Sequence, residues 1–522
     1  MLTQIKGIIM TESREIKVPH WSEQLARRVI GEKKAPIVVT GGMTTSGPAH
    51  LGTVCEFLYP TVIKRSIEAL GSRAEMHFVG DIMDALDSVP AELKNYTNVL
   101  TPELGKPLAY ALDPLGCHKS FGEHYLSEAE DIMKALKLDV DVVRADFLYQ
   151  SGAMDDFARL YLHEEQKVKE IVAKSSLKDL SSMANWSPIM PICEKCGKVA
   201  TTTVVWHNDE EYEYVCDRDV GYTKGCGFRG RNKISDHRYK LQWRVYWPAW
   251  MVHFKTSIEG SGVDHMTHGG SADTAIAMLK EILHHEPPIL FKYGFVLFKG
   301  KKASKSAGNA ASAKDILKLI PPEVLVYILV LPYLTQNKDI DPSGEKLMQV
   351  YDDLERVAKL ENPESRADEK KVMAYRLSVG KLAWKAPFVD ILTSYQVRRD
   401  WKKVGEELHD TQGVAYLAPY IEEWLRQGYV PDRYDFSIKP TRLTEHKEEV
   451  SEFAAKLSAD MDDITIHNLV YSVAKLSGIP APELFKAIYA ALIGKDNGPR
   501  LGKLIYFIGA DKAKHMLEDA VK

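Results

Sequence analysis

The sequence predicts an α/β protein in which a parallel β-sheet, interrupted by a cysteine-bearing segment, is followed by an all-helical region. Short apolar segments at 37–40 and 74–79 alternate with helical patterns, which is typical of a parallel sheet covered by helices. The cysteine-bearing segment at 193–226 breaks that alternation. From about residue 310 onward the apolar residues recur at helical spacing, so we expect no further strand of consequence there.

Composition places the chain among ordinary globular proteins. It has 522 residues, of which 45% are hydrophobic and 27% charged, with a formal net charge of −4. That length suggests about three or four domains. The charge argues against a protein coated in basic residues, although a local basic face would suffice to bind RNA.

No apolar run reaches the ~18 residues that a membrane span needs, and the N-terminal residues lack the features of a secretory leader. We therefore expect a cytoplasmic protein with no membrane association. In that reducing compartment the six cysteines are better explained as metal ligands or buried thiols than as disulfides.

The first strand and helix enclose a candidate anion site. Residues 37–40 form a buried strand, Gly41 and Gly42 are expected to end it, and a helix is expected to begin near His50. Backbone N–H groups and the helix dipole favour phosphate at such a helix start. The glycine spacing matches neither a dinucleotide fingerprint nor a P-loop, and taken alone this segment could be plain α/β structure.

The middle of the chain is predicted to hold a helix opened by a capping box at Ser127, a strand at 139–143 and one amphipathic helix at 155–173. Just before them lies a candidate metal cluster, composed of Asp113, Cys117, His118 and His124. These residue types suit zinc, but a polar loop remains an equal alternative. Adjacent Cys117 and His118 could both point inward only from a loop.

A second candidate metal cluster has the pattern of a zinc ribbon. Cys193 and Cys196 precede two strand-like segments at 201–206 and 212–215, and Cys216 and Cys226 follow. Two cysteine pairs can close a tetrahedral zinc site. Free thiols are the alternative.

The sheet is predicted to resume with the tryptophan-rich stretch at 241–250 and a strand at 291–298. The later helices are predicted at 321–334, 345–358, 368–379, 450–457, 466–477 and 481–492.

Several motifs in the correct order resemble those of class I aminoacyl-tRNA synthetases. T-S-G-P-A-H-L-G-T at 45–53 resembles the His-x-Gly-His motif, with Thr53 replacing the second His, and G-K-K-A-S-K-S at 300–306 resembles the lysine loop. Taken alone, that loop could be a solvated turn. With D-P-L-G-C-H-K-S-F-G-E-H at 113–124 and G-P-R-L-G at 498–502, the chain resembles the lysyl members of class I. Ala303, Lys305 and Tyr246 depart from the usual residues.

The resemblance implies a domain order. Residues 1–112 and 236–310 would form the two halves of a Rossmann-like catalytic domain, and 113–235 a zinc-bearing insertion near the tRNA acceptor end. Residues 311–360 would form a helical connector and 361–522 an all-helical anticodon-binding domain.

The resemblance also implies site residues. The catalytic groups would be His50, Lys302 and Lys305. The ATP-binding set would comprise Pro48, His50, Gly52, Thr53, Gly262, Asp264, Lys302, Ser304 and Lys305. The amino-acid-binding set would comprise Gly42, Thr44, Trp243, His265 and Tyr293, although tryptophans so closely spaced are more often core residues, which is the favoured alternative for Trp243. Mg²⁺ would accompany ATP, and about two structural Zn²⁺ ions would occupy the two clusters.

The implied activity is ATP-dependent ligation of L-lysine to tRNA(Lys) through lysyl-adenylate, by a monomer that requires tRNA for activation. Two alternatives remain: a class I synthetase for another amino acid such as glutamate, and a synthetase-like RNA-binding protein without catalysis.

Overall fold

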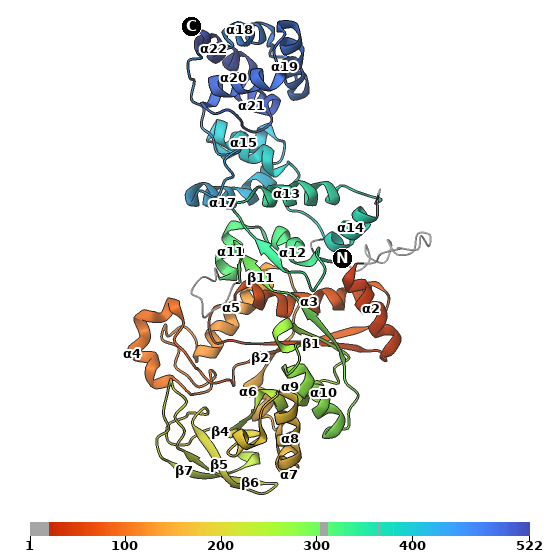
Figure 1. Ribbon diagram of the computed structural model, residues 1–522, viewed down its shortest axis with the longest axis vertical. Helices are drawn as coiled ribbons and strands as arrows, with labels where there is room; N and C mark the ends of the chain where they lie inside the picture. The colour runs from red at the N-terminus through yellow and green to blue at the C-terminus, as the bar shows by residue number, and fades with distance from the viewer. Residues whose placement is uncertain (1–19, 303–311, 364, 379) are drawn as a thin grey trace. The chain divides into compact units, whose positions relative to one another are not determined.

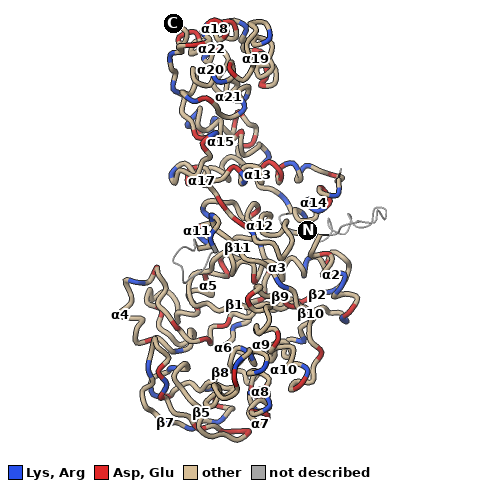
Figure 2. Tube along the Cα trace, viewed as in Figure 1, with Lys and Arg blue, Asp and Glu red and all other residues tan. Residues whose placement is uncertain are grey.

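The computed structural model describes residues 20–302, 312–363, 365–378 and 380–522, and these form two compact units (Figure 1). Unit 1 comprises Met1–Ile316, Val326–Ile340 and Pro363–Ser378; unit 2 comprises Leu317–Leu325, Asp341–Asn362 and Val379–Lys522. No helix within the described ranges has both the length and the apolar character needed to traverse a bilayer. Basic and acidic residues are interspersed along both units (Figure 2).

A five-stranded sheet in the order β10-β9-β1-β2-β3 organises unit 1. All neighbouring strands are parallel, which confirms the predicted fold class. The strands are β1 (Ile37–Thr44), β2 (Ala74–Asp81), β3 (Val142–Arg144), β9 (Ile258–Gly262) and β10 (Ile289–Tyr293).

The two glycines of β1 lie inside the strand, so the prediction that they end it is wrong. A Cβ at Gly41 would lie 3.1 Å from the backbone oxygen of Glu56, and one at Gly42 would lie 2.9 Å from the Trp250 ring. Successive strand residues face opposite sides of a sheet. The two glycines therefore let a helix approach β1 closely from each face.

The helices of unit 1 include those predicted near His50, near Ser127, at 155–173 and at 368–379, and several that were not predicted. They are α2 (Trp21–Glu32), α3 (Leu51–Ala69), α4 (Thr97–Leu100), α5 (Phe121–Ala135), α6 (Ala145–Gln150), α7 (Asp155–His163), α8 (Glu165–Ser175), α9 (Trp243–His253), α10 (Ser271–Glu281) and α14 (Arg366–Ser378). Helix α5 begins six residues before Ser127, because Ser120 caps it by accepting a hydrogen bond from the backbone N–H of Glu123. The predicted helix at 155–173 is two helices, which meet at Glu164. The tryptophan-rich segment forms α9 rather than a strand.

The insertion carries its own small sheets. Strands β5 (Thr202–His207), β6 (Glu211–Cys216) and β7 (Arg229–Lys233) form an antiparallel sheet, of which the sequence predicted only the first two strands. Strands β4 (Ile189–Pro191) and β8 (Tyr239–Leu241) form an antiparallel pair. The insertion shares one hydrophobic core with α9 and α10.

A third small sheet corrects two predictions. The segment at 291–298 is not one strand, because β10 ends at Tyr293 and β11 (Val296–Phe298) joins another sheet. There β11 pairs with β12 (Lys301–Lys302) and with β13 (Lys338–Ile340), a strand beyond residue 310 where none was expected.

Unit 2 is helical, as predicted. Helices α11 (Ala313–Leu319) and α12 (Pro322–Val330) contribute residues to both units. Unit 2 otherwise contains α13 (Glu345–Ala358), α15 (Phe388–Arg398), α16 (Trp401–Glu407), α17 (Thr411–Gln427), α18 (Lys447–Lys456), α19 (Asp463–Ser477), α20 (Ala481–Ile493), α21 (Leu501–Ile508) and α22 (Ala510–Val521). The predicted bounds of α13 are confirmed.

Candidate active site

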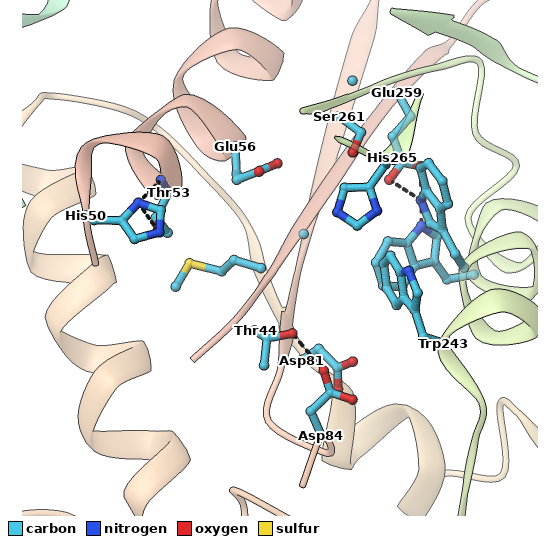
Figure 3. Close-up of a pocket in the computed structure, with 15 residues that line it drawn as sticks. Thr44, His50, Thr53, Glu56, Asp81, Asp84, Trp243, Glu259, Ser261 and His265 are labelled. Carbon is cyan, nitrogen blue, oxygen red and sulfur yellow. Dashed lines mark hydrogen bonds between the residues drawn. The ribbon is translucent and has the colours of Figure 1, made fainter. Parts of the chain in front are cut away.

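A cavity of about 360 Å³ lies at the carboxyl ends of β1 and β2 (Figure 3). In open α/β sheets this edge is where ligands bind. The lining residues are Gly42, Met43, Thr44, His50, Thr53, Glu56, Asp81, Asp84, Trp243, Trp247, Trp250, Glu259, Gly260, Ser261 and His265. Six of them were predicted from the sequence: Gly42, Thr44, His50, Thr53, Trp243 and His265.

His50 is the N-cap of α3. Its Nδ1 accepts a hydrogen bond from the backbone N–H of Thr53, at 3.1 Å. In a neutral imidazole that contact assigns the ring proton to Nε2, which becomes a donor. A Cβ at Gly52 would lie 2.9 Å from Cε1 of the His50 ring, so only glycine leaves the ring in this position.

The C-terminal side of the predicted lysine loop lies close to His50. Ser312 forms an isolated antiparallel β-bridge with His50, and the N–H of Ala313 donates to the carbonyl of Ala49 at 2.7 Å. Residues 312 and 313, which follow the predicted loop in sequence, are thus described beside the first motif although they are far from it in the chain. Lys302 ends β12, while its side chain, Ser304 and Lys305 lie outside the described part of the structure.

Three tryptophans of α9 form one wall. Trp243 and Trp247 are stacked with centroids 5.6 Å apart, and Trp243 meets Trp250 edge to face at 5.5 Å. Trp247 and Trp250 are each 2% exposed, whereas Trp243 is only partly buried. Trp243 therefore serves both as core and as cavity wall, and His265 lies beside it with centroids 5.9 Å apart.

Four carboxylic acids line the cavity, and the sequence analysis identified none of them. They are Glu56, Asp81, Asp84 and Glu259. An isolated acid in a strand or helix gives no distinctive spacing. The one available signal was an acidic residue inside the otherwise apolar and small stretch 258–262.

Two of these acids pair with one buried lysine. The ammonium of Lys240 bonds to Asp84 and lies 3.8 Å from Oδ2 of Asp81. Burial raises the pKa of Asp81 to about 6, while the charge of Lys240 opposes that rise. The Thr44 hydroxyl donates to Oδ2 of Asp84 at 2.8 Å, which ties this group to the end of β1.

Glu56 lies on α3, on the side of the sheet opposite the tryptophans. Burial raises its pKa to about 8, and the nearby Tyr293 hydroxyl opposes the rise. Tyr293 is 4% exposed, packs against Tyr59 with centroids 5.0 Å apart, and is not among the cavity-lining residues. Glu56 therefore lies between Tyr293 and the cavity.

The remaining predicted nucleotide-binding residues border the cavity without lining it. Pro48 and Gly52 flank His50 in sequence, and Gly262 ends β9. Asp264 belongs to a short 3₁₀ turn that directly follows β9.

The two predicted metal clusters both form. The sulfur atoms of Cys193, Cys196, Cys216 and Cys226 lie within 4.8 Å of one another, as do the ligand atoms of Asp113, Cys117, His118 and His124. In the second cluster Oδ2 of Asp113 accepts from the backbone N–H of both Cys117 and His118, at 3.0 and 2.9 Å. This turn allows adjacent Cys117 and His118 to point to one place, as the sequence required.

The sequence of this chain is similar to a described protein family and to several known proteins. Residues 19–381 match the family described as tRNA synthetases class I (K). A lysine–tRNA ligase from Archaeoglobus fulgidus is 30% identical over 524 residues, which cover 96% of this chain and 100% of that protein. One from Methanocaldococcus jannaschii is 29% identical, covering 94% and 98%. Lysine–tRNA ligase 1 from Methanosarcina acetivorans is also 29% identical, covering 92% and 95%.

Proposed function

Because this chain belongs to the family of class I tRNA synthetases for lysine, we propose that it joins L-lysine to tRNA(Lys) through lysyl-adenylate. A carboxylate oxygen of lysine attacks the α-phosphorus of ATP, and pyrophosphate leaves. The terminal ribose hydroxyl of tRNA then attacks the carbonyl carbon of the adenylate, and AMP leaves. No covalent bond to the enzyme is needed, so positioning and charge stabilisation supply the catalysis.

His50 is the group best placed to meet the phosphates. Its Nε2 proton, at the N-terminus of α3, can donate to a phosphate oxygen as negative charge develops there. Lys302, Ser304 and Lys305 supply further phosphate contacts, and Mg²⁺ enters with ATP. Gly262 and Asp264 at the end of β9 suit the ribose hydroxyls.

The observation that favours lysine over glutamate is the charge of the cavity. Among the described lining residues four are carboxylic acids and none is a lysine or arginine. A cavity lined by carboxyl groups and aromatic rings fits a substrate with an ammonium side chain better than one with a carboxylate, which finds no lysine or arginine among the described lining residues. The presence of His50 and of this cavity also disfavours a non-catalytic RNA-binding protein.

The two clusters fit structural zinc. Four cysteine sulfurs form the usual closed set, and an Asp, a Cys and two His form a mixed set of the same coordination number. The first would tie the loop at 193–196 to the β5–β6–β7 sheet. The second would fix the turn before α5. We propose that the enzyme acts as a cytoplasmic monomer and that unit 2 contributes to recognition of the tRNA.

We expect lysine-dependent exchange of pyrophosphate into ATP only when lysine tRNA is present. The physical reason is that tRNA binding would complete the site for the reacting carboxylate. Exchange assays with lysine, with and without transcribed lysine tRNA, test this, and glutamate tRNA is the matched control. Full exchange without any tRNA would contradict the requirement, while leaving the ligase activity in place.

A further inference from the structure

A second cavity, of about 1060 Å³, adjoins the catalytic cavity in unit 1. The two cavities share three lining residues, Thr44, Asp84 and Trp243, which therefore lie at the boundary between them. Most of the other lining residues of the second cavity belong to two segments of the insertion, 178–190 and 218–222. The insertion thus builds a large cavity directly beside the one in which we place the reaction.

The side chains of the second cavity combine positive charge with aromatic rings. Among its described lining residues four are basic and two are acidic. Lys178 and Arg218 are exposed, one from each insertion segment, while Trp186 is partly buried and Tyr222 is 38% exposed. Basic side chains that contact phosphates, together with rings on which bases stack, are typical of proteins that bind unpaired nucleotides. The second cavity therefore suits the unpaired end of a polynucleotide.

Lys240 of β8 lies at the boundary between the two cavities. It is 2% exposed and lines the second cavity. Its ammonium donates to Oδ1 of Asp84, and the Thr44 hydroxyl donates to Oδ2 (Figure 3). Burial lowers the pKa of Lys240, but the carboxylates of Asp81 and Asp84 more than offset this and raise it, so the ammonium stays charged. Asp84, which lines the catalytic cavity, is thus held by a cation of the protein itself.

The backbone around Lys240 joins it to both cavities. Met190 of β4 is its register partner in the antiparallel pair, and both residues line the second cavity. Two residues after Lys240, Gln242 precedes the first turn of α9, the helix that carries the tryptophans of the catalytic cavity. A ligand of the second cavity can therefore act on Lys240 and on the start of α9.

We propose that a phosphate of the unpaired 3′ end of tRNA binds in the second cavity and draws Lys240 away from Asp84, and that the Lys240–Asp84 contact keeps the catalytic cavity inactive until then. This inference rests on the proposed function, in which the terminal ribose hydroxyl of tRNA must reach the adenylate. The phosphate gives Lys240 another anionic partner, and the released Asp84 can accept a donor from a substrate. Lys240 is a positioning residue on this account.

The test measures lysine-dependent exchange of pyrophosphate into ATP by the full-length enzyme, with and without lysine tRNA. Lys240→Met removes the contact with Asp84, so exchange without tRNA should rise. The stimulation by tRNA should fall by about fivefold or more, the lower end of the usual coupling between two sites.

Lys338→Met is the matched control for loss of a buried lysine. Lys338 of β13 is 3% exposed, donates to the carbonyl of Leu334, and is not among the residues that line either cavity. This variant should keep the wild-type stimulation by tRNA.

A second measurement uses the wild-type enzyme and so does not depend on the folding of a variant. Lysine tRNA transcribed without its unpaired 3′ nucleotides should still bind, since the rest of the tRNA is intact. It should leave exchange at the level seen without tRNA, because none of its phosphates reaches Lys240.

Arg218→Ala tests the occupant of the second cavity. Loss of one phosphate contact should weaken binding of intact lysine tRNA and lower the slope of log Kd against log salt by about 0.7–1. Truncated tRNA should bind this variant and wild type equally. Lys174→Ala removes an exposed charge of α8 outside the second cavity, so it should leave the slope unchanged.

Three results would overturn the inference: unchanged tRNA stimulation in folded Lys240→Met, full stimulation by truncated tRNA, or an unchanged salt slope in Arg218→Ala. Full exchange by the wild-type enzyme without any tRNA would overturn it as well. Each of these results in an enzyme that charges lysine leaves the ligase activity standing. A wild-type enzyme that charges no lysine overturns both.

Discussion

Replacement of His50 by alanine is expected to lower the rate of lysyl-adenylate formation by about 10²–10³-fold, the usual loss for one oriented transition-state donor. Nδ1 of His50 accepts from the backbone N–H of Thr53, so Nε2 carries the proton offered to the phosphates. KM for lysine should change little, because the ring contacts charge that develops as pyrophosphate departs. Single-turnover measurements with lysine, ATP and tRNA give the rate directly.

Two further variants separate catalysis from helix capping. His50→Ser keeps an N-cap oxygen for α3, so it should restore the ~1 kcal/mol of stability that an alanine forfeits, but not the rate. His515→Ala, on the exposed surface of α22, should match wild type in both respects. A serine variant with wild-type rate would reduce His50 to a structural cap.

The second large effect is expected from loss of the zinc sites. The purified enzyme should contain about two zinc ions, with Cys196→Ser losing one and His118→Ala losing the other. Binding of structural zinc is worth about 10–16 kcal/mol in small zinc peptides, so the Cys196→Ser insertion should become sensitive to limited proteolysis. Metal analysis of each purified variant provides the count.

Cys55→Ala is the control for the metal count, since Cys55 is a buried free thiol of α3 outside both clusters. It should retain both ions. One equivalent of zinc in the wild-type protein would show that the Asp113–His124 cluster is not a zinc site. A wild-type protein without zinc would show that neither cluster is one.

Several residues that the sequence analysis took from motifs line one cavity, because parallel strands end at one edge and place such residues together. His50, Thr44 and His265 meet in this way from distant parts of the chain. The metal clusters were predictable because ligand types and spacing carry the chemistry.

Other features could not be predicted, for identifiable physical reasons. In α9 nearly every residue from Val245 to Met251 is buried, so no periodicity distinguished a helix from a strand. Gly41 and Gly42 resemble a turn in sequence, but close packing of α3 and Trp250 on β1 explains them. The hydrogen bonds that Glu259 accepts from Thr40, Trp247 and Trp250 join residues from three separate elements, and no spacing in the sequence indicates them.

The most direct test of the central claim is aminoacylation of lysine tRNA by the purified enzyme with each of the twenty amino acids. Lysine alone should be charged at a substantial rate. Arginine should fail, because its planar guanidinium does not fit a site for a compact ammonium. Glutamate should fail, because the described residues that line the cavity include no lysine or arginine to pair with its side-chain carboxylate. Efficient charging of glutamate without lysine would contradict the assignment.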